Sequence, residues 1–313
     1  MRTFLYQRAR EPNEAVQLAA AANPASAHSR NKVAYLAGGT TLTDLMKLDV
    51  AQPDVIIDIN PLTETGHGRI ELSQRGLRLG ALVREAADHF GVKSQYPVVA
   101  QSLSQAASQQ LRNMASLGGN VLQRTRCPYF RDVSYSECNK RNPGSGCAAL
   151  TGFNRMHAVL GASDQCIATY PGDFAQALIA LEATVEIAGS GSSRTIPFAN
   201  LHRKPDDTPD QETSLRPGEI ITSFLIPAAP WTRRSLYLND NLADYLVPVN
   251  ADVKQVEVIL VSEIDNDVNP AGVKGLGELA NVGTAAAIAN AVYHATGKRI
   301  RQLPIRIESV LSA

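Results

Sequence analysis

The four cysteines of this chain constrain its fold more than any other feature, because all of them fall between residues 127 and 166. Cys127, Cys138, Cys147 and Cys166 follow the pattern C-x10-C-x8-C-x18-C, among prolines and glycines. Four thiolates in one such stretch, with none left over, are typical of a metal centre ligated by four cysteines. We therefore expect these residues to form a loop around a metal.

Three other uses of four cysteines compete with this interpretation. Two disulfides would suit a small secreted domain, but the chain has 313 residues and its first residues lack the apolar stretch of a signal peptide. Structural zinc sites usually pair cysteines about two to four residues apart, and no such pair is present. Four buried, inert cysteines fit poorly with the surrounding prolines and glycines. Long, uneven spacings leave room for a bulkier iron–sulfur cubane.

The composition argues against two classes of function. The chain has 30 Lys and Arg against 30 Asp and Glu, and this balance does not suit a nucleic-acid binder or a membrane-surface protein. No apolar run approaches the roughly 20 residues of a spanning helix, so we expect no membrane insertion. We expect a cytoplasmic location, or a periplasmic one reached by co-export with a partner that carries a signal.

The hydrophobic pattern predicts a mixture of short strands and helices. We expect strands at residues 3–6, 33–36, 55–59, 69–72, 77–80, 184–187 and 219–226. We expect helices at residues 14–22, 42–47, 83–89, 98–107, 174–181 and 284–296. The polar, proline-rich residues 203–218 are expected to form a loop or lid.

Two glycine-rich turns predict a phosphate site. Ala37-Gly38-Gly39-Thr40-Thr41 lies between an expected strand and helix, and Ser116-Leu117-Gly118-Gly119-Asn120 offers a second turn. Glycines let the backbone aim successive N–H groups at one point, and a following helix adds its positive end. Two convergent turns suit the two phosphates of a dinucleotide, although each Gly-Gly pair alone fits a plain tight turn. The G-x-G-x-x-G fingerprint of a Rossmann site is absent.

Asp173 follows the last cysteine closely. Its carboxylate is suited to accept hydrogen bonds from a ribose or an adenine. The other interpretation is that Asp173 caps the N-terminus of the helix expected at 174–181. The sequence does not choose between them.

Five stretches of the chain carry a family resemblance: AGGTTLTDLMK at 37–47, LRLGALVRE at 77–85, LRNMASLGGNVLQRTRCPYF at 111–130, CNKRNPGSGCAAL at 138–150 and CIATYPGD at 166–173. Through them, residues 1–237 resemble the FAD-binding (medium) subunits of molybdenum hydroxylases, the xanthine dehydrogenase and carbon monoxide dehydrogenase family. They are most similar to the aldehyde oxidoreductase type, which carries an extra [4Fe-4S] cluster.

The resemblance implies an α+β fold of the PCMH, or molybdopterin dehydrogenase FAD-binding, type. Residues 1–58 would form the first subdomain, and residues 59–180 the second, with the cluster loop at 126–173. Residues 181–237 would form a truncated third subdomain.

The resemblance also implies the cofactors and the residues that hold them. The FAD pyrophosphate would lie on two runs of residues: Ala37, Gly38, Gly39, Thr40, Thr41 and Leu42, and Ser116, Leu117, Gly118, Gly119 and Asn120. Asp173 would contact FAD, and Ile221 would lie near the flavin. The [4Fe-4S] ligands would be Cys127, Cys138, Cys147 and Cys166.

In this family the subunit is part of an oxidoreductase. Electrons run from a molybdenum centre in a large molybdopterin-binding subunit, through [2Fe-2S] clusters of a small subunit, to FAD and an external acceptor. Four basic residues, Arg124, Arg126, Lys140 and Arg141, surround the cysteines. They are suited to offset the charge of a thiolate-ligated cluster, unless they are solvated loop charges.

The chain departs from the family near residue 238. A lysine expected near the flavin is replaced by Asn239, and residues 238–313 resemble instead the short α/β tail of the molybdenum subunit. Gly275–Glu278 matches the motif that bears the catalytic glutamate of that subunit. A general base without a positioned substrate does no chemistry, so we expect Glu278 to be inactive and no other residue is convincingly catalytic.

The sequence thus leaves two hypotheses. The chain is either an FAD- and [4Fe-4S]-binding electron-transfer subunit, or a non-catalytic fusion remnant that keeps only an interface with its partners or the cluster. Flavin content separates the two hypotheses, because part of the flavin wall is expected to be missing.

Overall fold

The computed structural model describes residues 2–22, 32–229, 232 and 284–300. Contacts divide the chain into two compact units, Met1–Tyr245 and Leu246–Ala313. In the second unit the described part contains helix α10, Thr284–Thr296, which ends before Gly297 at φ +72°, as the sequence predicts. None of the described helices is long and apolar enough to span a bilayer.

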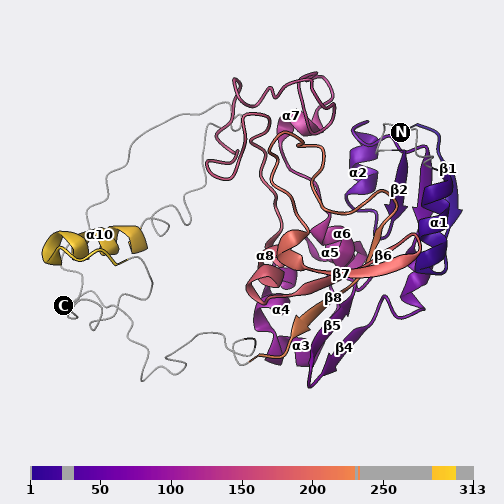
Figure 1. Cartoon of the computed structure of the whole chain (residues 1–313), viewed down its shortest axis with the longest axis horizontal. Coiled ribbons are helices and arrows are strands. Elements are labelled where there is room, and N and C mark those ends of the chain that lie inside the picture. The colour runs from indigo at the N-terminus through magenta and orange to yellow at the C-terminus, as the bar shows by residue number, and fades with distance from the viewer. Residues whose placement is uncertain (1, 23–31, 230–231, 233–283, 301–313) are drawn as a thin grey trace. The chain divides into compact units, whose positions relative to one another are not determined.

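The first unit begins with a three-stranded parallel sheet (Figure 1). Its strands are β1 (Leu5–Arg8), β2 (Val33–Leu36) and β3 (Val55–Asp58), in the order β1-β3-β2. Helix α1 (Pro12–Ala22) joins β1 to β2, and helix α2 (Leu42–Lys47) follows β2. The apolar run of β3 is typical of a strand covered on both faces. These elements confirm the predicted ones, with ends shifted by one or two residues.

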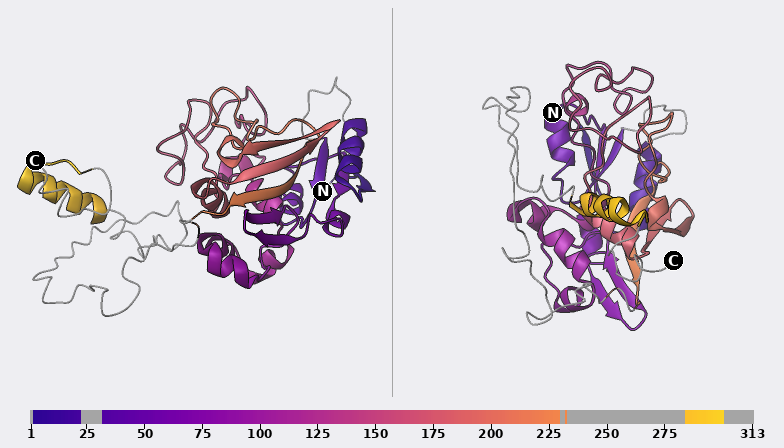
Figure 2. Two further views of the ribbon diagram at one scale, coloured as in Figure 1. Left: turned by 60° about the horizontal axis from the view of Figure 1, so that its bottom comes forward. Right: turned by 90° about the vertical axis from the view of Figure 1, so that its left-hand side faces the viewer.

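A second sheet has five antiparallel strands in the order β4-β5-β8-β6-β7, and Figure 2 shows β6 and β8 side by side. The strands are β4 (Ile70–Ser73), β5 (Gly76–Gly80), β6 (Thr184–Gly189), β7 (Ser192–Pro197) and β8 (Ile220–Pro227). Strand β8 pairs with β5 on one side and β6 on the other. Three of the five strands therefore come from residues 181–237, which the sequence placed in a third subdomain.

Helices cover one face of the second sheet. They are α3 (Phe90–Gln95), α4 (Pro97–Ser104), α6 (Leu117–Val121) and α8 (Asp173–Ala180). The short helix α5 (Gln109–Met114) precedes α6 and has no buried residue. Two short 3₁₀ turns are η1 (Asn60–Thr63) and η2 (Phe198–Asn200). Because strand residues alternate between faces, Val185 and Ile187 of β6 join the core under these helices, together with Phe224 of β8.

Helix α1 joins the two sheets through a second core. Its buried Ala15, Val16 and Ala19 pack with Ile57 of β3 and Ile220 of β8. Burying a residue such as isoleucine contributes roughly 1.5–3 kcal/mol, so this shared core ties the parallel sheet to the antiparallel one.

Two local predictions fail. The helix expected at residues 83–89 is absent, because this segment pairs with residues 112–117: Leu117 N–H donates to the Val83 carbonyl at 2.9 Å and Glu85 N–H to the Ala115 carbonyl at 3.0 Å. Strand β7 was not predicted, because its sequence SSRTIP is polar and half exposed at a sheet edge. Pairing with β6 determines its structure.

Residues 132–172 form one long loop without helix or strand, between the short helix α7 (Pro128–Arg131) and α8. Cys127 directly precedes α7, and Cys138, Cys147 and Cys166 lie in the long loop. We call residues 127–172, which include α7, the thiol loop. The irregular path agrees with the loop expected around the cysteines.

Candidate functional site

The two glycine turns touch each other. The first lies between β2 and α2 and the second starts α6. A Cβ added at Gly38 would lie 1.9 Å from the carbonyl oxygen of Met114, just before the second turn, so only glycine permits this approach. Arg84 donates to the same Met114 carbonyl and, at 2.8 Å, to Asn60 Oδ1. Asn60 Nδ2 in turn donates to the Ala37 carbonyl of the first turn at 2.9 Å, so the guanidinium is linked to both turns.

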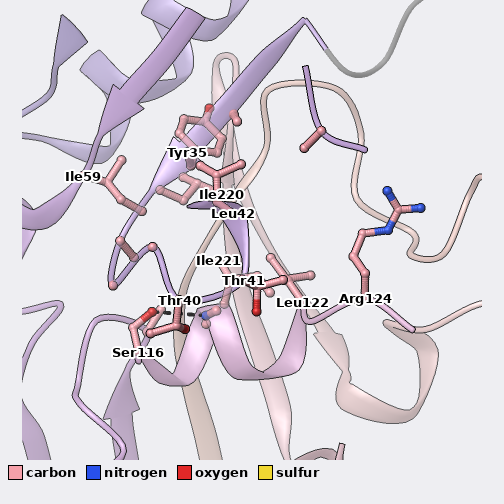
Figure 3. A pocket seen from close by; sticks show the side chains of 18 of the residues that line it. Tyr35, Thr40, Thr41, Leu42, Ile59, Ser116, Leu122, Arg124, Ile220 and Ile221 are labelled. Carbon is pink, nitrogen blue, oxygen red and sulfur yellow. Dashed lines mark hydrogen bonds between the residues drawn. The ribbon is translucent and has the colours of Figure 1, made fainter. Parts of the chain in front are cut away.

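The second turn is held in shape by its own side chains. The Ser116 hydroxyl accepts from the Gly119 N–H at 3.2 Å (Figure 3), and Asn120 Nδ2 donates to Glu85 Oε1 at 2.7 Å. Glu85 is buried, and burial raises its pKa while the hydrogen bond from Asn120 lowers it. The N–H groups of Leu117 and Gly118 are bonded to the carbonyls of residues 83 and 81.

The first turn keeps free donors. In the described part of the chain, the backbone N–H groups of Gly39, Thr40 and Thr41 have no backbone acceptor. Partly buried N–H groups rarely stay unpaired. Successive unpaired amides in a glycine turn form a concave anion site, and this is the donor set that a pyrophosphate requires.

A cavity lies on each side of the paired turns. The first has a volume of about 290 Å³ and is mostly apolar; Figure 3 shows Tyr35, Leu122, Ile220 and Ile221 around it. The second has a volume of about 780 Å³ and carries charged and polar side chains, namely Glu85, Asn120, Arg126, Arg131 and Asp173. Gly38, Gly39, Thr40, Thr41 and Gly119 line both cavities. A long ligand with its anionic centre on the turns therefore has room for one end in each cavity.

Most of the predicted cofactor residues line these cavities. Those that line the first are Ala37, Gly38, Gly39, Thr40, Thr41, Leu42, Ser116, Gly118, Gly119 and Ile221. Asn120 and Asp173 line the second. The Leu117 side chain lies outside both, fully buried in the core of the second sheet. Asp173 is the first residue of α8 and Gly172 holds the cap position, so the N-cap interpretation of Asp173 is wrong.

Tyr35 and Leu122 also line the first cavity, and neither was predicted from the sequence. The Tyr35 hydroxyl donates to the Gly218 carbonyl at 2.8 Å, which fixes the ring at the wall of the first cavity. Strand alternation offered a signal, because Tyr35 is an aromatic residue two positions before the first turn. Leu122 follows α6 directly and offered no signal of its own.

The structure brings the four thiols into one neighbourhood and forms no disulfide among them. Cys138 and Cys147 face each other in an antiparallel bridge. Burial raises the pKa of Cys127 and of Cys166; Cys138 and Cys166 also raise the pKa of Cys127, and Cys147 and Cys138 that of Cys166. Each of these two thiols therefore lies close enough to two other cysteines for their charges to raise its pKa. Within the described residues, however, no group of three His, Cys, Asp or Glu side chains is placed so that it could hold a metal ion.

The thiol loop is anchored on the helices α2 and α6. Arg131 of α7 forms an ion pair with Asp44 of α2 at 2.7 Å. The Tyr170 hydroxyl and His202 Nε2 both approach the Val121 carbonyl of α6, at 2.9 and 2.8 Å.

A small hydrophobic core continues the contact between the thiol loop and α2. It contains Leu45 of α2, Val50, Phe130 of α7 and Cys138. The thiols and the two cavities thus belong to one structural unit.

The basic residues around the cysteines have defined partners. Lys140 Nζ lies 2.8 Å from Glu212 Oε1, Arg124 forms an ion pair with the same carboxylate, and its guanidinium stands 4.6 Å from the Phe130 ring. Arg141 donates to backbone carbonyls of the thiol loop, including that of residue 130 at 2.9 Å. These contacts exclude the interpretation of solvated charges for Lys140, Arg124 and Arg141. Lys140 also lowers the pKa of the Cys166 thiol, against the larger effect of burial.

Two predicted positions of the tail, Asn239 and Glu278, lie outside the described residues. The tail helix α10 exposes apolar side chains of Ile288 and Tyr293, at 52% and 36%.

Comparison with known proteins agrees with this geometry. Residues 2–229 match the family described as "FAD binding domain in molybdopterin dehydrogenase". The chain is 47% identical over 231 residues to the aldehyde oxidoreductase FAD-binding subunit PaoB of Escherichia coli K12, which covers 72% of this chain and 69% of PaoB.

Two further similarities are partial. A stretch of 79 residues, 25% of this chain, is 46% identical to 11% of the aldehyde oxidoreductase molybdenum-binding subunit PaoC of Escherichia coli K12. A solved chain of carbon monoxide dehydrogenase from Hydrogenophaga pseudoflava superposes with a TM-score of 0.49 and 21% identity, over 73% of this chain and 60% of that chain. The family match over residues 2–229, with the α+β architecture, confirms the expected fold class, and the chain belongs to the family of FAD-binding domains of molybdopterin dehydrogenases.

Proposed function

We propose that this chain is the FAD- and [4Fe-4S]-binding electron-transfer subunit of a molybdenum-dependent aldehyde oxidoreductase of the xanthine dehydrogenase type. Two touching glycine turns between two cavities, with the thiol loop anchored on helices α2 and α6 beside them, support this proposal most strongly.

FAD fits the site by donors and by space. The unpaired N–H groups of Gly39, Thr40 and Thr41 would hold the pyrophosphate, since amides in such a turn converge on an anion. The cavities on either side, about 290 and 780 Å³, would take the two ends of the dinucleotide. In the second cavity, Asp173 would accept hydrogen bonds from the ligand. When bound, FAD supplies a carrier that takes up and releases electrons, and the protein tunes it by hydrogen bonds, burial and charge.

The cluster is supported by the gathering of four free thiols beside cations. Cys127, Cys138, Cys147 and Cys166 would ligate it, and a fourfold thiolate set is the usual one for [4Fe-4S]. Lys140 lies close enough to Cys166 to lower its thiol pKa. A cation in this position offsets the negative charge that four thiolates bring.

The partners of the proposed subunit follow from the relatives. PaoB and PaoC are subunits of an aldehyde oxidoreductase by name, one FAD-binding and the other molybdenum-binding. We propose that this chain works with a small [2Fe-2S] subunit and a large molybdopterin-binding subunit. Electrons from aldehyde oxidation at molybdenum would pass through the iron–sulfur centres to the FAD site and on to an external acceptor.

A second candidate rests on the match to PaoC. That match spans 79 residues, a length close to that of residues 238–313, and we propose that this segment is a molybdenum-subunit tail fused to the FAD subunit. The chain would then be a fusion remnant that lacks part of the flavin wall and keeps only an interface or the cluster. The complete set of turn and cavity residues in 37–122 favours the first candidate.

Cofactor content of the full-length chain, purified without oxygen, tests the proposal. We expect flavin bands, a broad iron–sulfur shoulder and about four irons per chain. A Cys147→Ser variant should lose iron, whereas Val159→Ser, at a 94% exposed position of the same loop, should keep it. Iron without flavin would favour the remnant, and a chain with neither cofactor would refute the redox function.

A further inference from the structure

One histidine of the thiol loop contacts a cysteine. His157 Nε2 lies 3.2 Å from the Sγ of Cys127, which is hydrogen-bonding distance for sulfur. The backbone N–H of His157 donates to the Asn154 carbonyl at 3.0 Å, and the centroid of the His157 ring lies 6.0 Å from that of the Tyr129 ring. The Tyr129 hydroxyl in turn donates to the Phe153 carbonyl at 3.0 Å. The imidazole is therefore held against the sulfur by contacts within its own loop.

The sulfur is the one polar partner of this ring in the part of the chain that the structure describes. His157 Nδ1 is buried and has no hydrogen-bond partner there. Two other described histidines contact backbone carbonyls, His67 that of residue 222 and His202 that of Val121, whereas His89 Nδ1 is also buried without a partner. His157 thus differs from them in both its partner and its place.

In the described part of the chain, three nitrogens contact the Cys127 sulfur, and one of them, His157 Nε2, belongs to a side chain. The backbone N–H groups of Tyr129 and Phe130 also bond to it, since both lower the pKa of Cys127. Backbone donors stay whatever the side chains are. Replacing His157 is therefore the one way to remove a donor from this sulfur while the path of the loop is kept.

A hydrogen bond to a ligating sulfur withdraws electron density from it. The reduced cluster carries one more negative charge than the oxidised one, so the bond stabilises the reduced state more, and the reduction potential rises. A donor lost at one of four sulfurs should lower the potential without removing a ligand.

We propose that His157 is a positioning residue that sets the reduction potential of the iron–sulfur centre by donating from Nε2 to Cys127 Sγ. This inference rests on the proposed function, because it requires Cys127 to be a cluster ligand. It adds a residue outside the four cysteines to the electron-transfer site.

The test is a redox titration of the anaerobically purified full-length chain, followed by electron paramagnetic resonance and visible absorbance, with iron assayed on each sample. His157→Phe keeps a flat ring and removes the donor, and His157→Gln restores an N–H donor. His294→Phe is the matched control, because His294 is exposed on α10.

We expect His157→Phe to keep its iron and to titrate at a lower potential than the wild type. His157→Gln should move back toward the wild-type potential, and His294→Phe should not differ from it. An unchanged potential in an iron-loaded His157→Phe chain would overturn the inference, and so would loss of iron from that variant alone, since His157 would then retain the cluster and not tune it. A wild-type chain without iron would refute the proposed function itself, and this inference with it.

Discussion

Replacing Gly38 by alanine should weaken FAD binding while the fold is kept. The added Cβ would stand 1.9 Å from the Met114 carbonyl oxygen, and real Cβ contacts are essentially never under 3.0 Å. The first turn must therefore move by about 1 Å away from the second, which separates the donors of Gly39, Thr40 and Thr41 from the rest of the site.

The size of the effect follows from the cost of overpacking. Such insertions cost roughly 1–3 kcal/mol, and each 1.4 kcal/mol is tenfold in an equilibrium constant. If the bound state requires the native spacing of the turns, the dissociation constant of FAD rises about 5- to 150-fold. Fluorescence titration of the cofactor-depleted chain with FAD measures it, and thermal unfolding of the same samples reports on the fold.

Gly76→Ala is the matched control for Gly38→Ala. Its Cβ would meet the Ile226 carbonyl oxygen at 2.1 Å, a similarly severe collision, but at the first residue of β5, where φ is +143°, and outside both cavities. We expect this variant to be less stable and to bind FAD with wild-type affinity. Equal FAD affinity in Gly38→Ala and wild type, or an equal loss of affinity in both variants, would show that the spacing of the two turns does not determine FAD binding.

Two further predictions concern ion pairs. In a double-mutant cycle, Arg131→Gln and Asp44→Asn should show a coupling of about 0.2–1 kcal/mol in unfolding free energy, since the 2.7 Å pair is partly exposed; additive effects would show that the pair does not hold the thiol loop to α2. Burial opposes ionisation of Asp58, but hydrogen bonds from Tyr6 at 2.7 Å, from residue 60 and from Arg8 at 3.0 Å outweigh it and lower the pKa of Asp58 from 3.8 to about 2. Because the pKa of Asp58 is lower in the folded chain than in the unfolded one, ionised Asp58 contributes about 2 kcal/mol to the free energy of unfolding. This contribution is present above about pH 4 and is lost as the pH falls through about 2. Urea unfolding between pH 5 and pH 2 should show the loss in wild type and not in Asp58→Asn; parallel curves would contradict it.

The sequence predicted the parts of the fold that depend on local patterns. Strand β2 and helix α2 have their predicted ends, because an apolar strand, a glycine turn and a short amphipathic helix follow one another directly. The strands of the second sheet were largely found too. Strand β7 and the structure of residues 83–89 were not predicted, because both depend on pairing. Strand β7 pairs with residues 3 to 13 positions away, and the bonds of residues 83–86 reach residues 26 to 34 positions away.

The candidate site was predictable in its residues and not in its geometry. The glycine turns carry their own signal, but the contact of Gly38 with Met114 joins segments far apart in the chain. The same holds for the thiol loop, where the sequence gives spacing alone and the fold brings Tyr170 and Val121 together. His157 offered no sequence signal, since its role depends on the side of the loop that faces Cys127.

Binding of FAD and of its two halves, FMN and AMP, would show whether one dinucleotide lies across both turns and both cavities. The cofactor-depleted full-length chain would be titrated with FAD alone and then with FAD in the presence of FMN or AMP as the competitor. We expect that FMN and AMP both compete with FAD and that FAD binds more tightly than either. Failure of one half to compete, or FAD binding no tighter than FMN, would contradict a site that spans the turns.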